Sequence, residues 1–276
     1  MYKNIGYHIG GKLLNMLKYI KQDKITVCQI FVTSNISFNM CKMDVDKLKL
    51  FGKELKRLGV KLFIHGPYII NLSNISATNF YKCKSVILNQ LEIANILNAK
   101  GVIIHMGKSK EDTEIKAIDN FVSSIKIILR EYKGNAKLIL ETAAGQGTEI
   151  CKDINDFAKL YNKFSLEEKT KIGICIDTCH IFAAGHDISS NHKAKKIYKK
   201  ITKLFEFDNI SCIHMNDSKG ILGCKKDRHE DIGYGKIGLE GLRYFYKKFN
   251  KQNVPMILET PTSHNSYIEQ IISLVS

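Results

Sequence analysis

The sequence lacks tryptophan, apolar runs long enough to cross a membrane, and cysteine pairs with the C-x-x-C spacing. None of its 276 residues is Trp, and no apolar run approaches the ~18 residues of a membrane-spanning helix. The first residues, MYKNIGYHIGG, contain no apolar signal-peptide region. The eight cysteines form no C-x-x-C motif, and Cys28, Cys175 and Cys212 lie in apolar patterns typical of buried strands. We therefore expect an intracellular protein with reduced thiols and no membrane partner.

The chain has fewer acidic than basic residues. There are 27 Asp and Glu against 42 Lys and Arg, which gives a formal net charge of +15. This excess favours a polyanionic partner such as nucleic acid, because Lys and Arg displace counterions from phosphates. Abundant Lys, Asn and Ile are also typical of an AT-rich genome, that of a small bacterium or of a large DNA virus. Charge alone leaves nucleic-acid binding and compositional bias as equal alternatives.

Six short apolar stretches each stop on a residue that binds metals in proteins. These end residues follow one another at intervals of 40, 36, 36, 37 and 45 residues, and they are His65, His105, Glu141, Asp177, His214 and Glu259. Each interval holds a strand, a helix and two loops. The pattern therefore indicates repeated βα units in which the ligand-type residue stands at the C-terminal end of its strand.

The alternation predicts a closed barrel. Eight strands are expected at residues 4–8, 25–31, 61–65, 101–105, 137–141, 172–177, 209–214 and 255–259. Apolar residues recur at helical spacing in residues 46–58, 79–98 and 115–132, and Gly59 is expected to end the first of these helices. We therefore predict an α/β fold in which residues 1–276 form a single (β/α)8 TIM-barrel domain, with the site at the C-terminal face of its strands.

The chemistry of these strand ends favours a multinuclear metal site. A lone His at a strand end is more often a hydrogen-bonded core residue, but burying three imidazoles and three carboxylates together is costly unless a cation neutralises them. His180 follows Asp177 by three residues, and Asp227 and His229 lie two apart in a long loop, residues 215–236. These three add a further ligand set. Nitrogen and carboxylate ligands without thiolate suit Zn²⁺, Mn²⁺ or Fe²⁺ at a hydrolytic site.

Several motifs resemble those of endonuclease IV, the type 2 apurinic/apyrimidinic endonuclease family. They extend from about Gly6 to Thr260 and read HGPYIINLSN, LETAAGQGTEI, GICIDTCHIFAAGHDI, IHMNDSKG, KKDRHEDIGYGKIG and ILET. The resemblance implies a barrel with three zinc ions, Mn²⁺ or Fe²⁺ being alternatives, that acts on double-stranded DNA. The oligomeric state is left open by the sequence, and a monomer is the default expectation. It implies hydrolysis 5′ to an abasic site by a metal-bridging hydroxide, leaving a 3′-hydroxyl and a 5′-deoxyribose phosphate. Removal of 3′-blocking groups is a further implied activity.

The resemblance also implies roles for individual residues. The first zinc would be held by His65, His105 and Glu141, the second by Glu141, Asp177, His214 and Glu259, and the third by His180, Asp227 and His229. The carboxylates Glu141, Asp177 and Glu259 are expected to be catalytic, with Glu141 bridging. Tyr68 and Ile69 are expected to enter the DNA stack at the lesion, a wedge that costs unstacking and permits a kink. Further DNA contacts are expected from Gln146, Asn216, Lys219 and Arg228.

Two stretches depart from the family pattern. The loop after the second strand, TSNISFN, has no Arg or Lys where the family often inserts an Arg, and Ile36, Ser37 or Phe38 occupies that region. Met-Gly follows His105 where the family usually has Pro-Gly, a change expected to alter the stiffness of the loop and not metal ligation. The basic run at residues 192–200 is expected to be a solvated helix face, with phosphate binding as the alternative.

Two other functions compete with a DNA-repair nuclease. A metal-dependent sugar isomerase or epimerase would share the barrel and two carboxylate-rich metal sites, but it needs neither the Asp-Arg-His motif nor a basic surface. A non-catalytic DNA-binding protein would have no reason to keep nine intact ligand-type residues.

Overall fold

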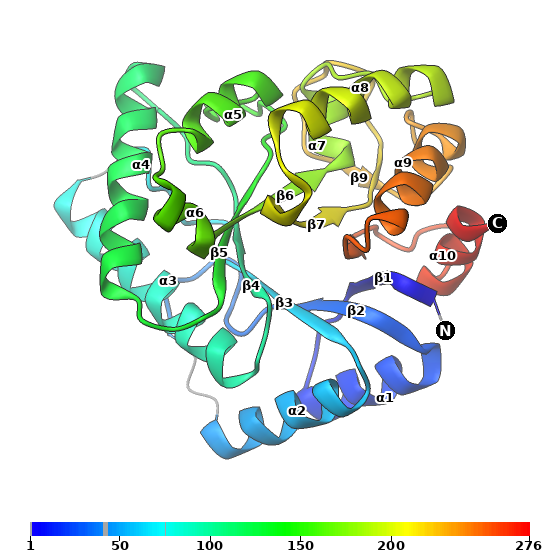
Figure 1. The fold of residues 1–276 in the computed structure, drawn as a ribbon, viewed down its shortest axis with the longest axis horizontal. Helices are drawn as coiled ribbons and strands as arrows, with labels where there is room; N and C mark the ends of the chain where they lie inside the picture. The colour runs from blue at the N-terminus through cyan, green and yellow to red at the C-terminus, as the bar shows by residue number, and fades with distance from the viewer. Residues whose placement is uncertain (1, 41–43, 75) are drawn as a thin grey trace.

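Eight parallel strands close into a barrel in the computed structural model, which describes residues 2–40, 44–74 and 76–276 (Figure 1). Neighbouring strands follow the order β1-β10-β7-β6-β5-β4-β3-β2 around the barrel. Their bounds are β1 Tyr2–His8, β2 Ile25–Ile30, β3 Lys61–His65, β4 Gly101–Ile104, β5 Lys137–Glu141, β6 Ile172–Asp177, β7 Ile210–His214 and β10 Met256–Leu258. The predicted (β/α)8 TIM barrel is confirmed.

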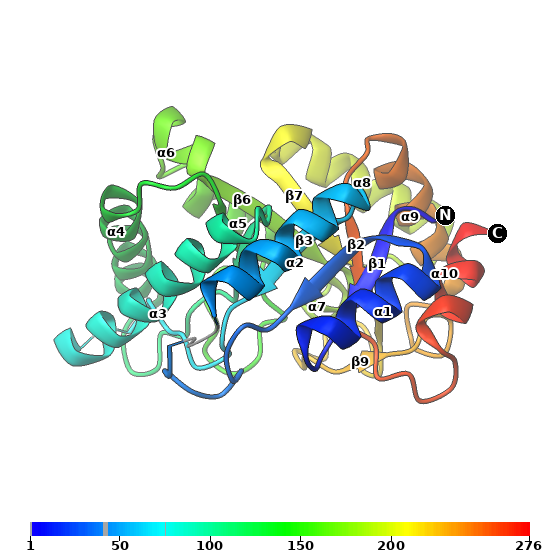
Figure 2. The same ribbon diagram turned by 90° about the horizontal axis from the view of Figure 1, so that it is seen from below.

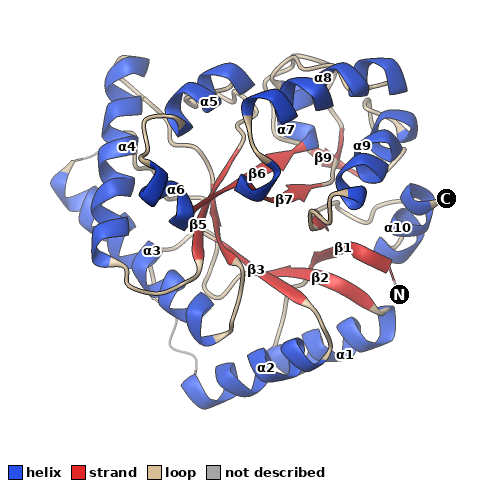
Figure 3. Ribbon diagram, viewed as in Figure 1, coloured by secondary structure: helices blue, strands red, loops and turns tan. Residues whose placement is uncertain are grey.

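Helices surround the barrel (Figure 3). They are α1 Leu13–Asp23, α2 Val45–Arg57, α3 Ala77–Ile96, α4 Glu114–Glu131, α5 Ile154–Tyr161, α6 Leu166–Lys171, α7 Thr178–Ala183, α8 Asn191–Leu204, α9 Leu239–Lys251 and α10 Tyr267–Val275, with a 3-10 turn at Phe207–Asn209. The three helices expected from apolar spacing are present, each beginning one or two residues earlier than predicted. Apolar periodicity in the sequence therefore located these helices correctly, and the structure differs from the prediction only at their ends.

Helix α2 illustrates how the local sequence sets these elements. The Asp44 side chain caps its first turn by accepting hydrogen bonds from the backbone N–H groups of Asp46 and Lys47. Leu48, Phe51 and Leu55 bury its apolar face. The helix stops before Gly59, whose φ of +68° is a left-handed conformation that an L side chain rarely adopts. The predicted end at Gly59 is correct.

A layer of side chains fills the barrel interior below the C-terminal ends of the strands. Seven strands contribute one buried residue each: Val27, Phe63, Ile103, Ile139, Cys175, Cys212 and Ile257. On the remaining strand, Gly6 pairs with Val27 on one side and Ile257 on the other. A Cβ at Gly6 would lie 1.7 Å from the Val27 carbonyl oxygen, so only glycine allows these strands to approach so closely. The barrel is thus a packed core that supports its upper rim.

The loops that leave the strand ends gather on one side of the barrel, the lower side in Figure 2. Two short features on this side add to the eight βα units. Helix α7 begins directly after β6, and a short antiparallel pair, β8 (Asp217–Ser218) with β9 (His229–Glu230), forms within the long loop at residues 215–236. Both carry ligand-type residues. Within the described part of the chain, no helix combines the length and apolarity needed to cross a membrane.

Candidate metal centre

The strand ends deliver the ligand-type residues to one point. Glu141, Asp177 and His214 are the last residues of β5, β6 and β7, and His65 is the last residue of β3. His105 directly follows the last residue of β4, and Glu259 directly follows the last residue of β10. Most of these side chains are almost wholly buried, as their exposed fractions show: His65 1%, Glu141 1%, Asp177 0% and His214 0%.

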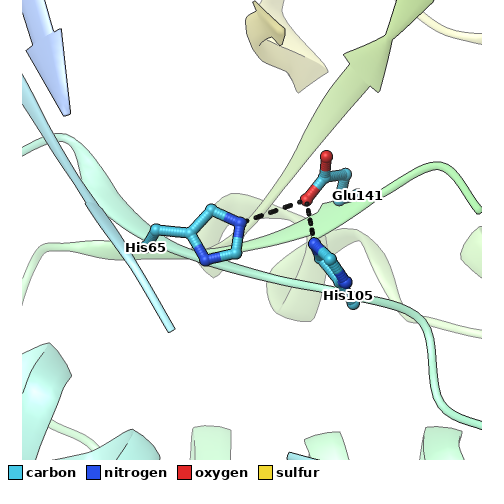
Figure 4. A group of neighbouring side chains, drawn as sticks. All are labelled: His65, His105 and Glu141. Atoms are coloured by element: carbon cyan, nitrogen blue, oxygen red, sulfur yellow. Dashed lines mark ion pairs between the residues drawn. The ribbon is translucent and has the colours of Figure 1, made fainter. Parts of the chain in front are cut away.

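The first cluster contains His65, His105 and Glu141, each offering an atom within 4.8 Å of the others (Figure 4). Glu141 Oε2 lies 3.5 Å from His65 Nε2 and 3.2 Å from His105 Nε2. Although buried, Glu141 Oε2 accepts no hydrogen bond. A buried carboxylate oxygen that faces two imidazoles without a hydrogen bond is the arrangement expected where a cation would complete the site.

The second cluster shares Glu141 with the first and adds Asp177, His214 and Glu259. His214 Nδ1 lies 2.8 Å from Glu141 Oε1, 2.9 Å from Glu259 Oε2 and 3.8 Å from Asp177 Oδ2. The two oxygens of Glu141 therefore face different clusters, since Oε2 faces the first and Oε1 faces the second. This is the geometry that a bridging carboxylate requires.

The third cluster contains His180, Asp227 and His229. Asp227 Oδ1 lies 3.2 Å from both His180 Nε2 and His229 Nε2. His180 reaches the site from α7, whose first turn is capped by the Asp177 side chain. The backbone N–H of Asp227 donates to Gln146 Oε1 at 3.2 Å. His180 Nε2 is buried and has no hydrogen-bond partner. In this it resembles Glu141 Oε2 of the first cluster, which is also buried and accepts no hydrogen bond.

Backbone carbonyls fix the orientation of three imidazoles. Nδ1 lies 2.7 Å from Gly66 O in His65, 2.7 Å from Thr142 O in His180 and 3.2 Å from Glu259 O in His229. A carbonyl oxygen only accepts, so Nδ1 carries the proton in each ring and Nε2 is left facing its cluster. Such backing of an imidazole from outside the site is typical of metal-ligating histidines.

Electrostatics in the clusters favour charged carboxylates. Burial opposes ionisation of Glu141, but His214 and His105 hold its pKa well below its usual range. The pKa of Asp227 is likewise lowered, since the attraction of His180 and His229 outweighs burial. Burial disfavours a charged His180, yet Asp177 and Asp227 raise its pKa well above its ordinary value. Protons on the imidazoles thus neutralise the carboxylates, and a divalent cation would displace those protons.

Two other groupings include thiols: Glu141, Cys175 and His214, and Asp177, Cys179 and His229. Burial raises the pKa of Cys175 well above its ordinary value and raises that of Cys179. A thiol that stays protonated is a poor metal ligand. The histidine and carboxylate sets therefore fit a metal better, and among these donors they fit zinc, manganese or ferrous ions.

The residues expected to contact DNA divide into exposed and buried ones. Tyr68 is 49% exposed, and its ring lies 5.4 Å from that of His65 and 5.3 Å from that of His105. Ile69 is half-buried beside it, and Lys219 and Arg228 are exposed. The loop after β2 is joined to this segment, because the Tyr68 backbone N–H donates to Asn35 O at 2.8 Å.

Asn216 and Gln146, both expected to contact DNA, are less exposed than Lys219 and Arg228. Asn216 is 0% exposed, and its amide donates to Asp177 Oδ2 at 2.8 Å while its oxygen accepts from the backbone N–H of Glu259 at 2.8 Å. Asn216 therefore lies among the clusters, and none of its surface is exposed for contact with DNA. Gln146 is half-buried and holds the Asp227 backbone.

In the loop after β2, Ile36 is the most exposed of the three residues named there. Its side chain is 73% exposed, whereas Ser37 is half-buried and Phe38 packs against the core. Ile36 directly follows Asn35, whose carbonyl is bonded to the Tyr68 backbone, and its exposed apolar side chain is free to touch a partner. The basic residues 192–200 lie in α8, a helix on the outside of the barrel.

Sequence reasoning missed three polar residues around the clusters, of which Gln29 and Asp217 are buried and His8 is half-buried. His8 ends β1, so it follows the same strand-end pattern, but it belongs to none of the clusters among the described residues. Gln29 interrupts the apolar strand ITVCQI, and a polar residue at such a position is a signal that the sequence does show. Asp217 accepts hydrogen bonds from the backbone N–H groups of Ser218, Gly233, Gly235, Ile237 and Gly238, which ties the long loop together. In the sequence, the only signal for Asp217 is its position in the HMNDSK motif.

Comparison with known proteins places this arrangement in a family. Residues 17–274 match the family model described as a xylose isomerase-like TIM barrel. A putative endonuclease 4 from Acanthamoeba polyphaga mimivirus is 36% identical over 269 residues, covering 95% of this chain and 86% of the viral protein. The chain belongs to the endonuclease IV family.

Solved structures agree with this fold assignment. Endonuclease IV from Thermus thermophilus superimposes with a TM-score of 0.79 at 23% identity, covering 99% of this chain and 96% of that one. A D-tagatose 3-epimerase-like protein has a TM-score of 0.72 at 18% identity, with 99% of this chain and 94% of that chain covered. At such low identity these likenesses establish the barrel alone, and the sequence relationship identifies the branch as endonuclease IV.

Proposed function

We propose that this protein is a DNA-repair endonuclease that hydrolyses the phosphodiester bond 5′ to abasic sites in duplex DNA. The expected products are a 3′-hydroxyl and a 5′-deoxyribose phosphate. The observation that carries the proposal is the convergence of nine ligand-type residues into three neighbouring clusters, two of which share Glu141, at the C-terminal face of the barrel. The net charge of +15 is consistent with a phosphate-rich substrate.

A third cluster favours a nuclease over a sugar epimerase. The proposed first and second sites share Glu141, and the third is built from His180, Asp227 and His229. A small neutral sugar presents no phosphate charge that a third cation would have to balance. Family membership points in the same direction, because the relative with 36% identity carries the name endonuclease 4.

The chemistry assigned to these residues is phosphoryl transfer. Paired metal ions in such sites activate water, hold the scissile phosphate and stabilise the leaving oxygen. Glu141 would hold two ions at a fixed spacing, because its two oxygens face different clusters. Asp177 links the second and third clusters, since its Oδ2 lies 3.8 Å from His214 Nδ1 and 3.5 Å from His229 Nε2. The carboxylates thus keep the three positions in one rigid unit.

Recognition of the lesion is assigned to the rim of the site. Tyr68 stands beside the first cluster with about half of its surface exposed, where it can fill the gap left by a missing base. An abasic nucleotide is the easiest to extrude, because it has no base to unstack. Ile69 lies next to Tyr68, and Ile36 sits on the loop bonded to it. We propose that these apolar groups form the wedge that an inserting Arg forms elsewhere in the family.

An incision assay tests the proposal. The protein is incubated with a 5′-labelled duplex that carries one tetrahydrofuran abasic analogue, alone or after treatment with a chelator. The expected result is a cut 5′ to the analogue that leaves an extendable 3′-hydroxyl and is abolished by the chelator. Tetrahydrofuran cannot undergo β-elimination, so a lyase gives no product.

Two controls separate this function from its alternatives. An intact duplex of the same sequence should remain uncut under the same conditions. Ketose sugars with added metal should show no epimerisation. Epimerase activity without incision, or DNA binding without incision in the zinc-loaded protein, would contradict the proposed function.

A further inference from the structure

Gln29 is hydrogen-bonded to three residues at the mouth of the barrel. It lies in β2 with 0% exposure. Its amide nitrogen lies 2.6 Å from Glu259 Oε1 and 2.9 Å from His8 Nδ1. Its amide oxygen lies 2.8 Å from His214 Nε2. Every polar atom of this side chain is therefore engaged, and two of the three partners belong to the second cluster.

These contacts fix which atom of each group carries the proton. A carboxylate accepts hydrogen bonds, so the amide NH₂ must face Glu259 and the amide oxygen must face His214. That oxygen can only accept, so His214 Nε2 must be protonated. In the neutral imidazole, Nδ1 then carries the free electron pair, and it points toward Glu141 and Glu259. Gln29 thus selects the form of His214 that can bind a metal through Nδ1.

His214 is backed differently from three other imidazoles of the clusters. His65, His180 and His229 donate Nδ1–H to backbone carbonyls and face their clusters with Nε2. His214 has the opposite ring orientation, and its outer nitrogen meets a side chain. A backbone acceptor survives any substitution, whereas the acceptor for His214 disappears when Gln29 is replaced. The second cluster therefore depends on a residue outside it.

We propose that Gln29 is a positioning residue of the metal centre, which holds His214 in its metal-binding tautomer and fixes the Glu259 carboxylate. The inference rests on the proposed function, because it takes His214 and Glu259 as ligands. Groups that orient metal ligands commonly contribute about 10–100-fold to metal affinity. Gln29 orients two ligands of one cluster, so its loss should act on that cluster first.

Zinc affinity of the full chain gives the first test. Metal-free wild type, Gln29→Met and Gln90→Met are titrated with zinc in competition with a chromophoric chelator. Methionine keeps the volume of glutamine and removes its hydrogen bonds. Gln90 is the matched control, because it is also 0% exposed and donates to Thr33 Oγ1 at 3.1 Å while belonging to no cluster. Gln29→Met should bind one zinc about 10–100-fold more weakly, and Gln90→Met should match wild type at all sites.

The NMR signal of the His214 ring gives a readout that a merely structural role would not move. In zinc-loaded wild type, the Nε2–H proton should resonate downfield and exchange slowly with water. Gln29→Met should shift it upfield and accelerate its exchange. Gln29→Glu keeps an acceptor at this position, so it should return the resonance toward its wild-type position. If Gln29→Met fails to fold, Gln29→Asn, whose amide is one methylene shorter, replaces it in both measurements.

The outcomes separate this inference from the proposed function. Wild-type zinc affinity and an unmoved His214 resonance in Gln29→Met would overturn the role of Gln29, while the nuclease assignment would stand on incision by wild type. Equal weakening in Gln90→Met would also overturn it, because the effect would then follow from loss of any buried amide. Failure of the wild-type chain to bind zinc would overturn both.

Discussion

Replacing Glu141 by glutamine should separate the chemistry of the centre from its scaffold. Glutamine has nearly the same shape, but its neutral amide offers one oxygen where the carboxylate offers two. Glu141 belongs to two clusters. If each cluster loses about as much as one orienting partner is worth, roughly 10–100-fold, incision falls about 10²–10⁴-fold. This corresponds to roughly 3–5 kcal/mol of transition-state stabilisation.

Single-turnover incision of the tetrahydrofuran duplex measures this loss, and metal content and thermal unfolding are recorded on the same preparation. The fold should survive, because the substitution changes no apolar packing. We expect weaker retention of the ions in the first two clusters, while the third keeps its ion, since His180, Asp227 and His229 are untouched. Near-normal turnover with unchanged metal content would remove Glu141 from the site and refute the bridging geometry.

Four further substitutions, one control variant and the salt dependence of DNA binding test other parts of the account. His229→Ala should lose about one metal equivalent while His264→Ala, at an exposed histidine outside the clusters, loses none; loss of all metals or of none would contradict the third cluster. Wild-type affinity for abasic duplex should fall by roughly 10³ or more between 50 and 200 mM salt for ~6 phosphate contacts. Tyr68→Ala should narrow the preference for abasic over intact duplex and leave that salt slope unchanged; an unaltered preference would assign lesion sensing to another residue. Asp217→Asn should lower the melting temperature and weaken metal binding at the third cluster, because an amide cannot satisfy so many backbone N–H groups; a wild-type melting curve would contradict its role in the loop. Burial and Lys200 lower the pKa of the His186 imidazole below its usual value. The contribution of His186 to the free energy of unfolding is therefore fully present above the unfolded-state pKa of about 6.5, and it is lost as the pH falls through the folded-state pKa. Urea unfolding at pH 7.5 and pH 5 should therefore show a smaller pH effect in His186→Gln than in wild type, and equal pH effects would refute this.

The sequence was sufficient to predict the barrel and the residues that gather at its mouth. The eight predicted strands and the three helices named in advance are all present, because apolar periodicity and strand-end polarity are local signals. His65, Glu141, Asp177 and His214 stand at strand ends as predicted. Convergence of these ends then follows from closure of the barrel, so one topological inference positions distant residues together.

Features that depend on tertiary contacts could not be predicted. The β8–β9 pair is two residues long on each side, too short to show a strand pattern. Asn216 was expected to contact DNA, yet it is buried inside the centre, where its amide donates to Asp177 Oδ2. The role of Gln29 depends on which groups face it across the barrel, and no local pattern carries that information.

A zinc-edge anomalous difference map from crystals grown with zinc tests the central claim most directly. The account predicts three peaks: one between His65, His105 and Glu141, one among Glu141, Asp177, His214 and Glu259, and one between His180, Asp227 and His229. Peaks confined to other parts of the chain, or no peak at any cluster in protein that still incises abasic duplex, would contradict it.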